Sequence, residues 1–133
     1  MKREDKMAIF KAMAFSFVFS LNYERRFIML EKRFKTELIN ELEDLFPGCI
    51  IIHGDANEIQ GLPDIIILYG DKWAALEGKK EEDSSHRPNQ DYYVEQMNHM
   101  SFAAFIYPEN KEEVIYELQT ALRPRRKARV SRS

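Results

Sequence analysis

Residues 61–79, GLPDIIILYGDKWAALEGK, decide the fold that this sequence predicts. The four consecutive aliphatic residues at 65–68 indicate a strand that is covered on both faces. A tight turn at residues 69–72 would fold the following segment back as a second strand. The predicted hairpin therefore brings Asp64, at the start of its first strand, beside Glu77, near the end of its second.

The second strand of this hairpin carries a charged face. Side chains alternate between the two faces of a strand, so Glu77 and Lys79 share a face with Ala75. Two carboxylates side by side repel each other unless a positive charge lies between them, and a divalent metal ion is the natural candidate. The sequence therefore predicts a metal site at Asp64 and Glu77 that Lys79 completes.

Length and composition indicate a single folded domain. The chain has 133 residues, of which 44% are hydrophobic, which is enough for one core and too short for two domains. Its one cysteine, Cys49, has no disulfide partner within the chain, which is typical of a reducing compartment, so we expect a cytoplasmic protein. We expect Cys49 to be a small buried residue rather than a nucleophile.

The charge is divided unevenly along the chain. Whole-chain net charge is −2, and the tail at 123–133 holds six basic residues and no acidic one, so residues 1–122 carry −8. An acidic body with a basic arm is typical of a metal-dependent enzyme that holds an anionic polymer, and a solvated, disordered terminus is the alternative. The basic residues of the tail are Arg123, Arg125, Arg126, Lys127, Arg129 and Arg132.

Residues 1–28 form an extension before the first predicted helix of the domain. The run at 7–21 is apolar except for Lys11, but fifteen residues are short for a membrane span, and no small-residue cleavage site follows it. We expect an extra helix or strand that packs on the domain or on a partner subunit. Contact with a membrane and a natural start at Met29 are the alternatives.

Helical periodicity begins at residue 29 and ends at Pro47. Glu31 lies close to the middle of the apolar stripe of this helix. A buried charge without a partner is costly, so either the first turn projects beyond the core or Glu31 faces a compensating group such as a metal. Glu37 and Glu41, which flank the stripe, are the fallback candidates. The stripe consists of Leu30, Phe34, Leu38, Leu42 and Leu45.

The remaining elements complete an α/β succession of helix, three strands, helix, strand and helix. A strand at 49–53 precedes the hairpin, and a polar, mobile segment at 80–90 follows it, where His86 meets either substrate or water. A helix at 88–100 has Pro88 in its first turn, and a buried strand occupies 102–107. Asn110 is expected to cap the last helix, whose buried side is Val114, Ile115, Leu118 and Leu122.

These motifs resemble the PD-(D/E)XK nuclease superfamily. Pro63-Asp64 matches the PD element, and Glu77-Gly78-Lys79 matches the (D/E)XK element. The GxPD form of residues 61–64, an acidic residue on the first helix (Glu31) and Gln90 at the start of the next are similar to the VRR-NUC type, whose small phage members resemble Holliday junction resolvases. Gly78 departs from the family pattern, because the middle residue is usually apolar, and Lys80 would replace Lys79 if the register slipped.

The resemblance covers residues 29–122 and implies a fold and an activity. The implied fold is the restriction-endonuclease-like αβββαβα core, with a mixed central sheet flanked by helices. The resemblance leaves two segments unexplained: residues 1–28, an extension for which dimerisation is one expected role, and the basic tail at 123–133. The implied activity is a structure-specific endonuclease for branched DNA such as Holliday junctions, acting as a homodimer without a membrane, in a host cytoplasm if phage-encoded. A nuclease that nicks or trims DNA ends and an inactive DNA-binding module are the alternatives.

The resemblance also assigns roles to residues. Asp64 and Glu77, with Glu31 directly or through water, would hold Mg²⁺ or Mn²⁺ by hard oxygen ligands. Lys79 would orient the attacking water or stabilise the transition state, and Gln90 would position water or phosphate. No histidine and cysteine set of the zinc type occurs in the sequence. The residues expected to contact DNA are Lys80, Arg87, Arg123, Arg125, Arg126 and Lys127.

Overall fold

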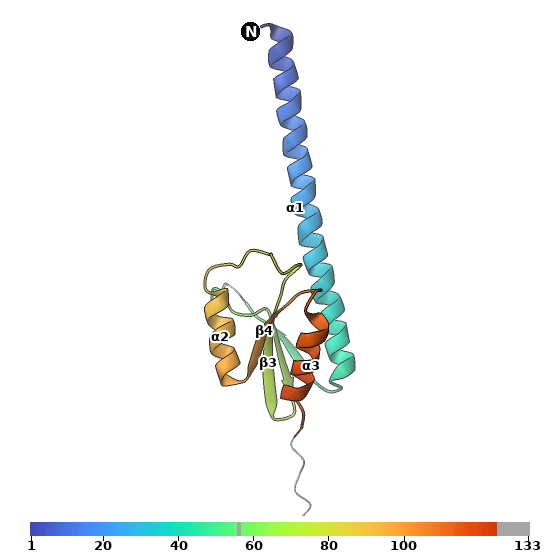
Figure 1. The fold of residues 1–133 in the computed structure, drawn as a ribbon, viewed down its shortest axis with the longest axis vertical. Coiled ribbons are helices and arrows are strands. Elements are labelled where there is room, and N and C mark those ends of the chain that lie inside the picture. The colour runs from blue at the N-terminus through green and yellow to red at the C-terminus, as the bar shows by residue number, and fades with distance from the viewer. Residues whose placement is uncertain (56, 125–133) are drawn as a thin grey trace, which may run out of the picture.

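The computed structural model describes residues 1–55 and 57–124, which form an α/β fold of three helices and a mixed four-stranded sheet (Figure 1). The predicted order of the elements is confirmed. Arg125, Arg126 and Lys127 lie outside the described residues. The elements are α1 (Arg3–Leu45), β1 (Ile50–His53), β2 (Ile65–Tyr69), β3 (Lys72–Gly78), α2 (Gln90–Met100), β4 (Phe102–Ile106) and α3 (Lys111–Ala121).

The strands lie in the order β1-β2-β3-β4. β1 pairs with β2 and β2 with β3 in antiparallel fashion, and β3 pairs with β4 in parallel. The predicted hairpin of β2 and β3 is confirmed, with Ile65 opposite Leu76 and the turn at Gly70-Asp71. β1 begins one residue later than predicted, so Cys49 lies just before it, where it is half-buried against the core.

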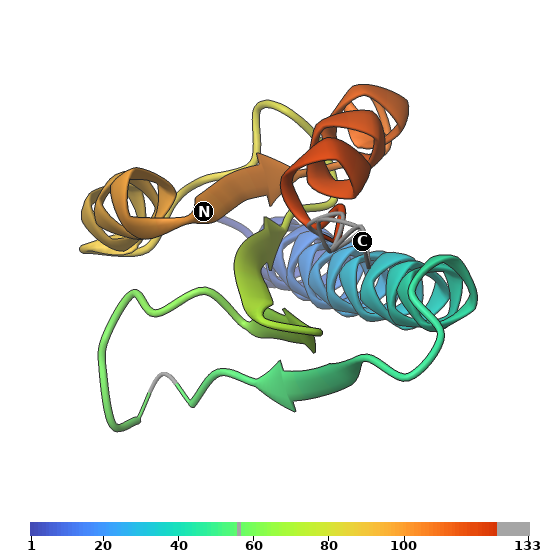
Figure 2. The ribbon, with the colours of Figure 1, turned by 90° about the horizontal axis from the view of Figure 1, so that it is seen from below.

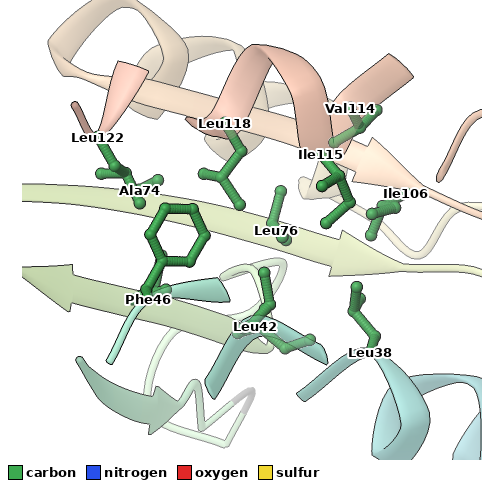
Figure 3. Packing of buried hydrophobic residues seen from close by; sticks show 12 residues of the cluster. Leu38, Leu42, Phe46, Ala74, Leu76, Ile106, Val114, Ile115, Leu118 and Leu122 are labelled. Carbon is green, nitrogen blue, oxygen red and sulfur yellow. The ribbon is translucent and has the colours of Figure 1, made fainter. Parts of the chain in front are cut away.

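Two hydrophobic clusters hold helices against the two faces of the sheet. α1 and α3 cover one face and α2 the other (Figure 2). On the α1 and α3 face, Leu38 and Leu42 meet Leu76 of β3 and Leu118 of α3, all fully buried (Figure 3). The buried side predicted for α3 is confirmed. On the other face, Val94 of α2 packs on residues that include Ala75 and Ala103.

α1 is one continuous helix of 43 residues, about 64 Å long, and its first half extends beyond the rest of the fold (Figure 1). Residues 1–46 contain no glycine or proline, so nothing interrupts the helix before Pro47-Gly48. Residues 1–28 were predicted to form a helix or a strand, and from Arg3 onward they form a helix. The side chains of residues 7–21 are exposed, so this segment does not pack on the domain, and packing on a partner subunit stays a prediction.

The buried stripe of α1 is shorter than predicted. Leu38 and Leu42 are fully buried and Phe34 is half-buried, whereas Leu30 is 41% and Leu45 36% exposed. The strands that α1 covers have four to seven residues, so a longer helix overshoots them at both ends. Within residues 1–55 and 57–124, no helix combines the length and the apolar character that crossing a membrane requires.

One predicted helix start and one predicted capping contact need correction. α2 begins at Gln90 rather than at Pro88, because Asn89 adopts a left-handed conformation with φ of 68°. Asn110 does occupy the cap position of α3, but its side chain makes no hydrogen bond to the first turn of that helix. Its amide instead donates to the carbonyl of Phe105 at 3.0 Å and accepts from the amide of Tyr107 at 2.9 Å, so Asn110 holds the end of β4.

Candidate functional site

A cleft of about 450 Å³ lies between α1, the loop before β2, the end of β3 and the segment that leads into α2. All five predicted catalytic residues line this cleft, and so does Arg87. They belong to four separate parts of the chain, and the fold brings them together. The five are Glu31, Asp64, Glu77, Lys79 and Gln90.

The pairing of β2 with β3 places Asp64 beside Glu77, as predicted. Ile65 lies opposite Leu76, so the residue before Ile65 meets the residue after Leu76. The amide of Asp64 donates to Glu77 Oε2 at 3.0 Å, and the amide of Gly78 donates to Asp64 Oδ1 at 3.3 Å. The two carboxylates are therefore held by main-chain atoms of the hairpin itself.

Gln90 connects the acid of the hairpin with its lysine. Its Nε2 donates to Glu77 Oε1 at 2.8 Å, and its Oε1 accepts from Lys79 Nζ at 2.8 Å. Lys79 also donates to the carbonyl of Ser85 at 3.2 Å, and the amide of Arg87 donates to Gln90 Oε1 at 2.8 Å. Glu77, Gln90 and Lys79 are only 4%, 5% and 6% exposed, so these contacts replace water almost completely.

Gly61 allows the loop before β2 to approach the start of α2. Its φ of +91° is a conformation that glycine adopts without strain, and a Cβ at this position would lie 2.6 Å from the carbonyl carbon of Asn89. The glycine of the GLPD segment therefore allows Asp64 and Gln90 to line the same cleft.

Burial shifts the proton affinity of Glu77. The loss of water around its carboxyl, and secondly the negative charge of Asp64, raise the pKa of Glu77 to about 7. The amide of Asp64 and the cations Lys35 and Lys79 oppose this shift but do not cancel it. A further cation at this point would lower the pKa of Glu77 and favour its charged form.

Lys35 is a site residue that the sequence analysis missed. Its ammonium forms an ion pair with Asp64 Oδ2 and lies 3.3 Å from Glu31 Oε1, so it links Glu31 to the hairpin. Burial alone would lower the pKa of Lys35, but the hydrogen bond and the charge of Asp64 outweigh burial and raise it. The spacing of four residues between Glu31 and Lys35 was the available signal.

Gly78 provides the space that Lys35 uses. A Cβ on Gly78 would lie 2.9 Å from Cγ of Lys35, so the lysine stem crosses β3 at the one residue that has no side chain there. Gly78 pairs regularly with Ile106 and does not form a bulge. The register therefore does not slip, and Lys79 rather than Lys80 faces the cleft.

The other predicted residues lie away from the cleft. Glu37 pairs with Arg33 at 2.9 Å on the exposed side of α1, and Glu41 pairs with Lys111 at 2.8 Å, so neither fallback carboxylate belongs to the site. The ammonium of Lys80 lies 4.2 Å from the ring centre of Phe27.

His86, which was expected to contact substrate or water, contacts two side chains of the protein. Its ring stacks on Phe105 with 4.2 Å between ring centres, and its Nδ1 lies 2.6 Å from Asp91 Oδ1. Arg123 is also remote, because its carbonyl accepts from Lys72 Nζ at 2.7 Å. Lys72 begins β3, about 17 Å from Glu77 at the spacing of an extended strand.

The carboxylates of the cleft are suited to an open Mg²⁺ site with few protein ligands rather than to a site formed by protein ligands alone. Within residues 1–55 and 57–124, no group of three or more histidine, cysteine, aspartate or glutamate side chains is arranged to hold a metal. Mg²⁺ typically uses one or two carboxylates and completes its shell with water and substrate phosphate. Asp64 and Glu77 lie together and would be these two carboxylates, and Glu31 lies beyond Lys35.

Comparisons of the chain with models of protein families, with curated proteins and with solved structures gave no match.

Replacing Gly78 with alanine tests the contact between β3 and Lys35. The added Cβ would collide with the lysine stem, so we expect the Gly78→Ala protein to lose about 1–3 kcal/mol in the free energy of unfolding. Urea denaturation measures this loss. The same substitution in a Lys35→Ala background should cost little, because the colliding atoms are gone. Equal costs in both backgrounds would contradict the contact.

Replacing Glu77 with glutamine tests the raised pKa. Without metal, the folded protein keeps a proton on Glu77 that the unfolded chain releases above about pH 4.5, so the free energy of unfolding should fall as the pH rises from 4.5 to about 7. Glu77→Gln removes this contribution, and its urea denaturation in EDTA should show a smaller fall over that range. Glu37→Gln, at an exposed position, is the control and should follow the wild type.

Proposed function

We propose that this protein is a metal-dependent DNA endonuclease of the PD-(D/E)XK superfamily, of the VRR-NUC type. The observation that carries the proposal is the delivery of Asp64, Glu77 and Lys79 to one cleft by a single hairpin, with Gln90 joined to both Glu77 and Lys79. The order of the elements and the mixed sheet agree with the restriction-endonuclease-like core that the sequence motifs imply.

Three residues of the cleft have parts in the proposed reaction, namely Asp64, Glu77 and Lys79. A bound Mg²⁺ or Mn²⁺ ion supplies activation of water and neutralisation of charge on the phosphate. Asp64 and Glu77 would hold this ion, and the ion would favour the charged form of Glu77. Lys79 donates to Gln90 and Ser85 and lies 3.8 Å from Glu77 Oε1, and its third donor would serve the attacking water or a phosphate oxygen.

The proposed substrate is branched DNA, such as a Holliday junction. The support is the similarity of the GxPD segment, Glu31 and Gln90 to the resolvase-like nucleases, together with the basic tail. Arg87 lines the cleft and is the described arginine best placed to meet a phosphate there. We place this activity in the cytoplasm, in agreement with the single cysteine.

We further propose that two copies of the chain associate through the first half of α1. Phe15 is 75% exposed, and Phe10, Phe17 and Phe19 are exposed beside it, which is costly in water. At 100° per residue, Glu4, Phe15 and Arg26 share a face of the helix, with Phe15 midway between the two charges. An antiparallel pair centred on Phe15 would set Glu4 of each copy opposite Arg26 of the other, as two-fold symmetry requires.

Cleavage of a labelled four-way junction and of a matched linear duplex, each with Mg²⁺, Mn²⁺ or EDTA, tests the nuclease proposal. The wild type should cut the junction selectively and only with metal. Asp64→Ala should cut at least on the order of a hundredfold more slowly, because it removes a metal ligand, and should still bind DNA. Glu37→Ala, which removes an exposed carboxylate from α1, should cut as the wild type does.

Other outcomes separate the alternatives. Equal cutting of both substrates would keep the nuclease and reject the junction as its preferred target. Tight binding without any cutting would favour a DNA-binding module without catalysis. Metal-dependent cutting by Asp64→Ala at the rate of the wild type would show that the site is elsewhere.

Placing a charge at Phe15 tests the dimer. We expect the wild type to sediment as a dimer and Phe15→Glu as a monomer, because a carboxylate would be buried at the centre of the helix pair. Tyr116→Glu, at a comparably exposed aromatic residue of α3, should remain dimeric. A monomeric wild type, or a dimeric Phe15→Glu protein, would contradict this arrangement.

A further inference from the structure

A protein cation already lies at the carboxylates of the cleft. The ammonium of Lys35 contacts Asp64 Oδ2 and lies 3.3 Å from Glu31 Oε1. Asp64 is a ligand of the proposed metal site, and Glu31 is the carboxylate expected to join it directly or through water. The side chains of Lys35, Asp64 and Glu31 are about three-quarters buried. One monovalent cation therefore serves two carboxylates for which a divalent ion would compete.

The position of Lys35 is built into the fold. Its backbone lies in α1, one turn after Glu31, and its stem crosses β3 over Gly78, where a Cβ would lie 2.9 Å from Cγ and 3.2 Å from Cε. This crossing fixes where the ammonium arrives. Lys35 thus differs from Arg33, two residues earlier, which pairs with Glu37 on the exposed side of the same helix.

Acidic and basic side chains line the cleft in equal number. Three acidic side chains meet three basic ones. Lys79 is held inside by Gln90 and Ser85, so Lys35 is the basic group in direct contact with Asp64. A divalent ion at Asp64 would repel an ammonium that shares the same carboxylate. The six residues are Glu31, Asp64, Glu77, Lys35, Lys79 and Arg87.

We infer that Lys35 occupies the cation position at Asp64 and Glu31 when no metal is bound, and that a divalent ion binds only by displacing it. Lys35 then sets the metal concentration at which the site fills. This inference rests on the metal site of the proposed function and adds a competing group from the chain itself.

Direct measurement of Mn²⁺ binding, by electron paramagnetic resonance of the free ion in titrations of the full-length protein, tests the competition. Lys35→Gln removes the charge and should bind Mn²⁺ about tenfold more tightly, which is the effect of losing one charge-assisted hydrogen bond. Arg33→Gln changes the net charge equally and should bind within about twofold of the wild type. Lys35→Arg keeps a cation and should not gain affinity.

Thermal unfolding provides a second readout. In EDTA, Lys35→Gln should melt below the wild type, because Asp64 and Glu31 lose their partner. Mg²⁺ should then raise its melting temperature more than it raises that of the wild type. Gly78→Ala is the substitute variant if Lys35→Gln fails to fold. It retains every charge but pushes the lysine stem aside, so its Mn²⁺ affinity should also be higher than that of the wild type.

The possible failures are distinguishable. Lys35→Gln that binds Mn²⁺ like Arg33→Gln, or more weakly, would overturn the competition, while loss of binding in Asp64→Ala would still support the metal site. Absence of Mn²⁺ binding in every protein, or unchanged binding in Asp64→Ala, would overturn the inference together with the proposed metal site.

Discussion

The register between β2 and β3 is the constraint on which the core and the cleft both depend. Ile65 opposite Leu76 places Asp64 against Glu77, and the same pairing buries Ala74 and Leu76 completely between the sheet and its helices. Shifting β3 by one residue would turn its charged side chains toward α1 and α3 and its apolar side chains toward the cleft. The hydrophobic core thus holds the two carboxylates together at a distance that their own repulsion opposes.

The buried polar and charged side chains of the cleft all have hydrogen-bond partners. Within residues 1–55 and 57–124, no buried side-chain nitrogen or oxygen is without a hydrogen-bond partner. Gln90 is central to this, because its amide donates to Glu77 and its carbonyl accepts from Lys79. A glutamate at 90 would add a charge beside Glu77, and an apolar residue would leave both charged groups unpaired. Burial of the carboxyl, and secondly the charge of Asp64, still raise the pKa of Glu77 in this network.

Features that depend on local pattern were predictable from the sequence, and those that depend on where elements cross were not. An apolar run, a turn and a charged alternation were sufficient to place Asp64 beside Glu77. Lys35 was missed because its role depends on the angle at which α1 crosses β3 and on the space above Gly78. The exposure of Leu30 has the same origin, since periodicity gives the face of a helix but not the length that a sheet covers.

The balance of charge in the cleft bears on how metal and substrate would arrive. With three acidic and three basic side chains, the cleft has no net attraction for a free divalent ion until one of its own cations moves away. Lys35 is the candidate, because Lys79 is almost fully buried and Lys35 is not. A phosphodiester entering the cleft would offer this ammonium a new anionic partner and thereby release Asp64. If the proposed nuclease function holds, DNA and metal would each favour the binding of the other, because both exchange partners with the same lysine.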